Sequence, residues 1–407
     1  MPTSTKATIV FWQRLILVIS APVVFLLGTD LVIRLSGIDT DVARNENFDI
    51  AVPVWLLDDE NWVDIQRGRL EGPRGVRAED VAWLRHFEEA RYIEYKLKSN
   101  IEVDATNPFN NIELQKGSTF RLTSNDDGFR TREFKPKRAG VSRIVTIGDS
   151  STFGWGVDPE YTYQRLLEDR FNSNAGESET EVFNLGISGH TSRHGLAIFE
   201  HYVRDLDPDV VIISYGANDA RFVLQSIDEV LDADETWRGS VRSVLYRFAS
   251  FRLLRRWILG IYDPFDASRE RAEIEGDSRA LVYSVERDTY MENLRSLITG
   301  AQGLGARSLL LAVCAQSEYV RGMDYVAQTE GVPLVNAGPL FQSRLEDLRS
   351  HRLYREEVRF YEELYGLDTL AQRPELYVTT DGCHPGRAGH SLIADAIYDA
   401  LSRDSSS

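Results

Sequence analysis

The 407-residue sequence contains little cysteine, no surplus of basic residues and no repeated motif. Its two cysteines, Cys314 and Cys383, are too few for a disulfide framework or an all-cysteine zinc site. Lysine and arginine total 46 against 63 aspartate and glutamate residues, which gives a net charge of -17. A general nucleic-acid-binding protein needs a basic surface, so this class is excluded. What remains is a composition typical of globular proteins, with 43% hydrophobic and 27% charged residues.

Long apolar runs are also scarce, and the clearest covers residues 15–33, where Asp30 is the only charge. A run of this length can cross a bilayer, so we expect residues 1–36 to form a cytoplasmic tip and a transmembrane anchor. Lys6 and Arg14 precede the run and favour an orientation with the rest of the chain outside the cytoplasm, in the periplasm or at the surface of a bacterial cell. A cleaved signal peptide and a buried core helix are the alternatives.

The remaining residues divide into an extension, 37–142, and a larger region, 143–403, with insertions at about 222–285 and 340–378. Within the extension, apolar residues near helical spacing predict a helix over 79–98. From residue 143, short apolar runs alternate with helical patterns, which predicts an α/β fold with a parallel sheet covered on both faces. The expected strands are 143–147, 181–185, 210–214, 307–313 and 333–335, and the expected helices are 161–171, 192–203, 286–304, 319–330 and 387–401.

Residues that can take part in catalysis follow the first strands. They are expected at the carboxyl edge of the sheet, where parallel sheets bind ligands. Ser150 follows the first strand in the motif GDSST, and Gly189 follows the second in NLGISGHTS. Each motif also has a non-catalytic explanation. The Gly-Asp-Ser tripeptide can occur by chance, and the segment with Gly189 can be an ordinary turn between a strand and a helix.

The third and fourth motifs supply an amide and an imidazole. Asn218, in GAND, could donate from its side-chain amide to an oxyanion, although an Asx turn or a helix cap would also use it. Asp381 and His384, in DGCHP, are spaced so that the carboxylate can orient the imidazole toward a serine. The alternative is that Asp381 and His384 belong to a turn with no catalytic role.

The four motifs in this order resemble those of the SGNH (GDSL-type) hydrolase superfamily, over residues 143–401, and the segment 124–134 looks like a feature of its membrane-anchored members. The resemblance implies a flavodoxin-like three-layer α/β/α sandwich with a five-stranded parallel sheet. It also implies that Ser150 is the nucleophile and that His384 is the general base, oriented by Asp381. Ser150, Gly189 and Asn218 would form the oxyanion hole, and neither a cofactor nor a metal is expected.

Three further features fall outside the motifs. Residues 238–262 contain six arginines and no acid, and their pattern fits either a helix packed on the domain or an interfacial helix that faces a membrane or an anionic polymer. The two cysteines are expected to be free, with a disulfide outside the cytoplasm as the alternative. His190, His194 and His201 lie at helical spacing but lack the further ligands of a zinc site, and His390 is expected on a helix surface.

These observations predict a serine esterase that removes acyl groups, with acetyl on a cell-envelope carbohydrate as the expected substrate. An O-acyltransferase acting on an exopolysaccharide or envelope glycan would use the same residues, because a sugar hydroxyl can replace water in the second half-reaction. A non-catalytic glycan-binding envelope protein is the alternative of a different class. The expected partners are an acylated small molecule or glycan and a membrane, reached through the N-terminal helix and residues 238–262, but no nucleic acid.

Overall fold

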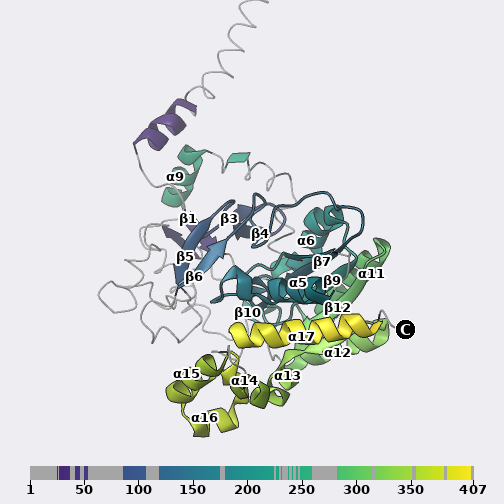
Figure 1. Ribbon diagram of the computed structural model, residues 1–407. Coiled ribbons are helices and arrows are strands. Elements are labelled where there is room, and N and C mark those ends of the chain that lie inside the picture. The colour runs from purple at the N-terminus through teal and green to yellow at the C-terminus, as the bar shows by residue number, and fades with distance from the viewer. Residues whose placement is uncertain are drawn as a thin grey trace, which may run out of the picture. The chain divides into compact units, whose positions relative to one another are not determined.

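The computed structural model describes most of the region that carries the four motifs and smaller parts of the rest (Figure 1). The described residues are 25, 27–36, 42–45, 50–53, 86–106, 119–174, 179–223, parts of 226–258, 282–313, 317–350, 354–379 and 383–404. The chain forms two compact units. One comprises His86–Asp232 with Asp277–Ser407, and the other Met1–Arg85 with Ala233–Gly276.

The first of these units is built on a five-stranded parallel sheet in the order β13-β12-β9-β7-β8. Its strands are β7 (Val141–Gly148), β8 (Glu179–Asn184), β9 (Val210–Ser214), β12 (Arg307–Ala312) and β13 (Leu334–Asn336). Numbered along the chain, the order is 2-1-3-4-5, the flavodoxin type. The predicted parallel sheet is therefore confirmed, with strand ends within a few residues of the expected ones.

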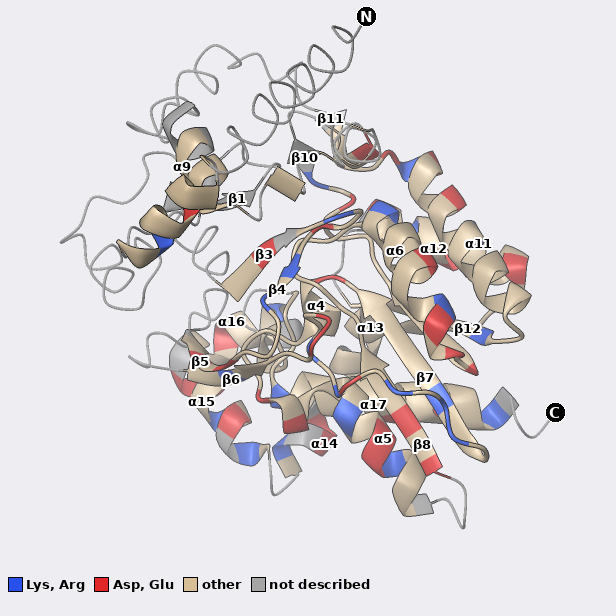
Figure 2. Ribbon diagram, turned by 90° about the horizontal axis from the view of Figure 1, so that it is seen from above, with Lys and Arg blue, Asp and Glu red and all other residues tan. Residues whose placement is uncertain are grey.

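The strands are mostly buried because helices cover both faces of the sheet. All five residues of β9 are buried, as expected for a central parallel strand. One helical layer contains α5, α13 and α17, and the other contains α6, α11 and α12 (Figure 2). The helices of this unit include α4 (Ser150–Phe153), α5 (Tyr163–Asn174), α6 (Ser192–Ile198), α11 (Arg287–Gly303), α12 (Ser317–Glu330), α13 (Ala337–Ser343), α14 (Leu345–Ser350), α15 (Arg355–Tyr365), α16 (Leu367–Gln372) and α17 (Arg387–Asp404).

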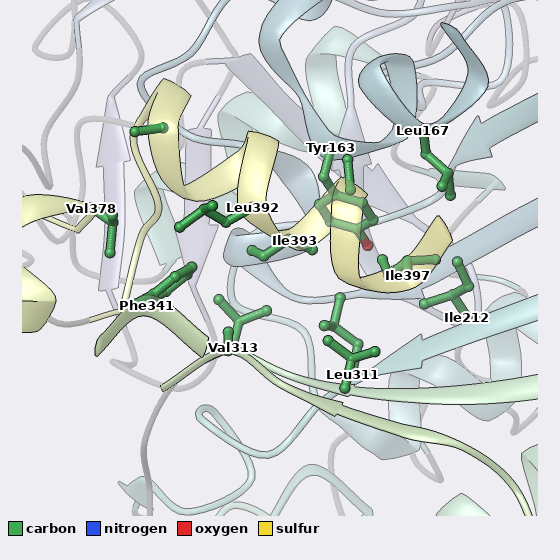
Figure 3. Packing of buried hydrophobic residues seen from close by; sticks show 14 of the residues in the cluster. Tyr163, Leu167, Ile212, Leu311, Val313, Phe341, Val378, Leu392, Ile393 and Ile397 are labelled. Atoms are coloured by element: carbon green, nitrogen blue, oxygen red, sulfur yellow. The ribbon is translucent and has the colours of Figure 1, made fainter. Parts of the chain in front are cut away.

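Alternate residues of each strand serve the two layers. Ile212 and Leu311 belong to the core cluster beneath α5, α13 and α17, where they meet Tyr163, Phe341 and Ile397 (Figure 3). Because side chains alternate along a strand, their neighbours in sequence point to the opposite layer. Side chains packed on the two faces of the sheet fix the register of its strands, and this register sets where each strand ends.

Two antiparallel hairpins precede the sheet in the same unit. They are formed by β3 (Phe87–Ala90) with β4 (Glu94–Leu97) and by β5 (Glu102–Thr106) with β6 (Thr119–Thr123). The predicted helix over residues 79–98 is wrong in its described part. Tyr92 and Glu94 have positive φ angles, which turn the chain back on itself, and the apolar residues bury themselves in a strand pair instead. A two-residue pair, β10 (Phe222–Val223) with β11 (Val282–Tyr283), closes the ends of the first insertion.

The other unit contains a helical stretch over residues 27–35, the pair β1 (Val42–Asn45) and β2 (Ile50–Pro53), and α9 (Ala249–Ile258). Asp30 links the first helix to α9, because its Oδ1 accepts a hydrogen bond from the Ser250 backbone N–H at 3.2 Å. Most of the apolar run 15–33 lies outside the described residues. Among those described, no helix combines the length and the apolar character needed to cross a membrane.

Candidate active site

Ser150 lies at the sharp turn between β7 and α4. Asp149 caps this helix, since its Oδ1 accepts a hydrogen bond from the Ser151 N–H at 2.9 Å. Gly148 makes the turn possible because a Cβ there would lie 2.6 Å from the Ser214 carbonyl oxygen of the neighbouring strand. As the first residue of α4, Ser150 has a backbone N–H without an acceptor inside the helix, and its hydroxyl stands at the carboxyl edge of the sheet.

His384 reaches this serine from a loop more than two hundred residues further along the chain. Its Nε2 lies 2.8 Å from Ser150 Oγ. The loop is also tied to α4 by Ser151, whose hydroxyl donates to the Cys383 carbonyl at 3.3 Å. The sequence-predicted pair of Ser150 and His384 is therefore brought together, whereas Asp381 lies outside the described residues.

The cysteine beside this histidine is oxidised. Cys383 is disulfide-bonded, and the other cysteine of the sequence, Cys314, lies outside the described residues. The expectation of a free thiol at Cys383 is wrong. A disulfide depends on which cysteines tertiary folding brings together, and no local sequence pattern records this. The disulfide thus constrains the residue next to the imidazole.

Gly189 and Asn218 lie at the same edge on neighbouring segments. The segment after β8, which we call the Gly189 loop (residues 186–192), starts close to β7, because the Ile187 N–H donates to the Gly148 carbonyl at 3.0 Å. Gly189 itself has a φ of +83°, a conformation that favours glycine. One N–H of the Asn218 amide donates to the His190 carbonyl at 3.0 Å, which leaves its second N–H available.

A buried carboxyl group joins the third motif to this loop. Asp219 Oδ1 accepts hydrogen bonds from the Ser192 backbone N–H at 2.9 Å and from its hydroxyl at 2.5 Å. Asn293 of α11 in turn donates to the Ser192 hydroxyl at 2.9 Å. Burial raises the pKa of Asp219 to about 7, and burial also raises the pKa of Asp149. Ionised carboxylates are thus disfavoured beneath a site where negative charge would develop.

The histidines that the motifs do not use are structural. His190 and His194 are completely buried and stack on each other, with ring centroids 4.1 Å apart. His390 is also completely buried, so its expected place on a helix surface is wrong; its Nδ1 accepts a hydrogen bond from the Tyr163 N–H at 3.1 Å. Its spacing from the apolar residues Ile393 and Ile397 puts it on the core face of α17, a signal that could have predicted its burial.

A small pocket opens between the carboxyl ends of β9 and β12. It has a volume of about 280 Å³, including its open mouth. Its lining includes three tyrosines and consists of Asp149, Ser214, Tyr215, Gly216, Ala217, Tyr290, Ala312, Val313, Tyr319, Val320 and Met323. Its lining includes Asp149, which precedes Ser150, and Gly216 of the third motif.

Comparison with known proteins supports the relationship that the motifs suggested. Thioesterase 1/protease 1/lysophospholipase L1 of Escherichia coli K12 is 30% identical over 83 residues, which are 20% of this chain and 38% of that protein. An arylesterase of Vibrio mimicus is 32% identical over 77 residues, 19% of this chain and 38% of the relative. The chain thus matches less than half the length of these curated relatives.

Two esterases are among the solved structures to which this chain is similar. The esterase EstA from Pseudoalteromonas sp. has 16% identity and a TM-score of 0.37, covering 65% of this chain and 100% of its own. The acetylxylan esterase Axe2 from Geobacillus stearothermophilus has 19% identity and a TM-score of 0.35, covering 64% and 94%. The profile of the GDSL-like Lipase/Acylhydrolase family matches residues 146–392, more than half of the sequence. The chain belongs to the GDSL-like lipase/acylhydrolase family.

Proposed function

We propose that this protein is a serine esterase that hydrolyses short acyl esters, with acetyl groups on a cell-envelope carbohydrate as its substrates. The observation that carries the proposal is the 2.8 Å approach of His384 Nε2 to Ser150 Oγ at the carboxyl edge of the sheet. A hydroxyl is a weak nucleophile unless a base accepts its proton during attack, and an imidazole nitrogen at this distance is such a base.

In this mechanism Ser150 attacks the ester carbonyl while His384 Nε2 takes its proton. We assign Asp381 the role of orienting the His384 ring, so that the acceptor nitrogen stays directed at the serine. The imidazolium then returns the proton to the leaving alcohol, and an acyl-serine remains. Water then attacks the acyl carbonyl and gives a proton to His384 Nε2. The imidazolium returns this proton to Ser150 Oγ as the carboxylic acid leaves, which regenerates the serine hydroxyl.

The negative charge of the tetrahedral intermediate is stabilised by three donors: the backbone N–H groups of Ser150 and Gly189 and the second amide N–H of Asn218. Support comes from the hydrogen bond of Asn218 to the His190 carbonyl, which fixes the amide, and from the glycine conformation at Gly189. A fixed donor of this type typically contributes about 3–4 kcal/mol to the transition state.

The pocket beside Gly216 supports a preference for short acyl chains. The side chains of Tyr215, Tyr290 and Tyr319 line it. Tyr290 is completely buried and its hydroxyl donates to the Tyr215 carbonyl at 3.0 Å, so this wall is rigid. A long acyl chain would have to displace these packed aromatic rings.

The test is hydrolysis of p-nitrophenyl esters of increasing acyl length by the wild type and by Ser150→Ala. We expect acetate to be the best substrate and the Ser150→Ala variant to be inactive. Full activity in Ser150→Ala, or a preference for long acyl chains, would contradict the proposal. A parallel assay with an acetylated donor and a polysaccharide acceptor separates hydrolysis, which yields acetate, from transfer, which yields an acetylated acceptor.

We also propose that the unit containing residues 1–36 attaches the protein to a bacterial membrane, with the Ser150 site outside the cytoplasm. The helical stretch 27–35 and its flank expose large apolar side chains by more than half: Phe25, Leu27, Leu31, Val32 and Leu35. Such a surface is typical of a membrane or protein contact. The acid-free segment 238–262, which begins after the exposed Trp237 and includes α9, adds six arginines that suit anionic lipid.

Flotation of the full chain with vesicles tests this attachment. We expect it to float with phosphatidylcholine vesicles containing phosphatidylglycerol, and deletion of residues 1–36 to reduce the floating fraction. The absence of the full chain from the vesicle fraction would overturn the proposal.

A further inference from the structure

The hairpin β3–β4 lies outside residues 146–392, which the family profile matches, yet it contacts the loop that carries Gly189. The Tyr95 hydroxyl donates to the Ser188 carbonyl at 2.9 Å. His190 Nε2 lies 3.2 Å from the Tyr95 carbonyl oxygen. Glu94 Oε2 lies 3.3 Å from Nε2 of His194, the third residue of α6. One short strand therefore contacts both neighbours of Gly189 and the helix that follows.

The hydrogen-bond partners of His190 and His194 determine which ring nitrogen carries the proton in each. A carbonyl can only accept, so His190 carries its proton on Nε2. Nδ1 of His194 accepts the Thr191 N–H at 3.1 Å, so the proton of His194 is also on Nε2 and points at Glu94. Burial lowers the pKa of both histidines, that of His194 to about 3, so both rings are neutral. The contact with Glu94 is thus a hydrogen bond from a neutral imidazole to a carboxylate.

Ring packing makes these contacts a continuous column. The Tyr95 ring lies 4.9 Å from that of His190, which stacks on His194 at 4.1 Å with an interplanar angle of 10°. Tyr95, His190 and His194 are all buried, and Glu94 is only 7% exposed. A carboxylate is rarely buried without a partner, so its position at the end of this column indicates a specific role.

The column ends at the donors of the oxyanion hole. His190, held through its ring, supplies the carbonyl that accepts from Asn218, and Ser188, held by the Tyr95 hydroxyl, precedes Gly189. On the other side, Asp219 holds the loop through Ser192. Two of the three donors therefore depend on a segment clamped between the hairpin and the third motif.

We propose that Glu94 and Tyr95 are positioning residues for the oxyanion hole: through His194 and His190 they hold Gly189 and Asn218 where the developing negative charge will lie. This inference rests on the proposed esterase function. Preorganised donors need no rearrangement during the reaction, and their displacement by about 1 Å can lower the rate 100-fold. The hairpin is thus part of the catalytic apparatus although it lies outside the family's matched region.

The test compares three substitutions in the full chain. Glu94→Gln keeps an oxygen acceptor for His194 and should retain most of the wild-type kcat. Glu94→Leu removes the acceptor and should lower kcat about 10- to 100-fold with little change in KM. Glu88→Leu, at an exposed position of β3, is the matched control and should behave as the wild type. Thermal unfolding verifies that each variant is folded.

A second measurement excludes a merely structural role and covers the case in which Glu94→Leu does not fold. Tyr95→Phe removes one hydroxyl and should lower kcat several-fold, but much less when Asn218 is already alanine, because the two residues act through the same donors. The inference would be overturned if Tyr95→Phe lowered kcat equally in the wild type and in Asn218→Ala. An unchanged kcat in folded Glu94→Leu would also overturn it. If Ser150→Ala were as active as the wild type, the proposed esterase function itself would fail. This result differs from those that would overturn only the positioning role of Glu94 and Tyr95.

Discussion

The two sides of the candidate site are held in different ways. On the oxyanion side, the Gly189 loop is bound through fully buried groups by the β3–β4 hairpin and by Asp219. On the base side, His384 is half-buried on a loop attached through the Cys383 carbonyl and the disulfide of that residue. The difference fits the chemistry: donors that stabilise charge act best when they do not move, whereas a base must turn between the serine, the leaving group and water.

The largest effect should come from Ser150→Ala, because it removes the atom where the two sides meet. We expect kcat for p-nitrophenyl acetate to fall by about 10⁶-fold, since neither side can act without the nucleophile. Ser151→Ala is the matched comparison: it removes the hydroxyl contact with the Cys383 carbonyl and should lower kcat far less. A large loss in Ser151→Ala with little loss in Ser150→Ala would reverse the assignment.

Asn218→Ala tests the oxyanion side alone. Loss of one preorganised donor should reduce kcat about 100- to 1000-fold while the midpoint of thermal unfolding changes little. Asn218→Asp keeps the shape but replaces the donor with an acceptor, and its kcat should fall at least as far. A loss below tenfold in both variants would mean that this side contributes little charge stabilisation.

Cys383→Ser tests the base side. A disulfide limits the freedom of the unfolded chain, so its removal should lower the free energy of unfolding by about 2–4 kcal/mol, measured by denaturant titration. Activity should fall less than in Asn218→Ala, because the base side tolerates motion. Reductant should destabilise the wild type and leave Cys383→Ser unaffected. If kcat fell as far as in Asn218→Ala, the base side would be as rigidly organised as the oxyanion side.

The smallest effect is a pH dependence arising at Asp219. Burial raises its pKa to about 7 in the folded state, so between pH 5 and 7 it stays largely protonated while the carboxyl of the unfolded chain ionises. The unfolded state then binds fewer protons, and stability falls as pH rises. Relative to Asp219→Asn, the wild type should lose about 2 kcal/mol of unfolding free energy from pH 5 to pH 7. A pH-independent difference between the two proteins would show that Asp219 is ionised throughout.

Much of the sheet and part of the site could be predicted from local pattern. Short apolar runs such as Val210–Ile213 predict central strands because both faces of a parallel sheet are covered, and the carboxyl ends of parallel strands share one edge. Ser150 follows such a strand, whereas the prediction for His384 came from the DGCHP motif and its resemblance to the family; the two side chains lie within hydrogen-bonding distance. The helix predicted over 79–98 failed because apolar spacing in a short segment does not distinguish a helix from a turn between two strands.

The sequence by itself determined the order of strands and helices and the chemistry at their ends, because these follow from periodicity and from residue type. Only the tertiary structure decided which side chains support that chemistry. Glu94 and His194 are a hundred positions apart and meet because the hairpin packs on the Gly189 loop. Burial of a histidine, or the pKa of a carboxyl such as Asp219, depends on neighbours that chain folding brings together, and no local pattern records them.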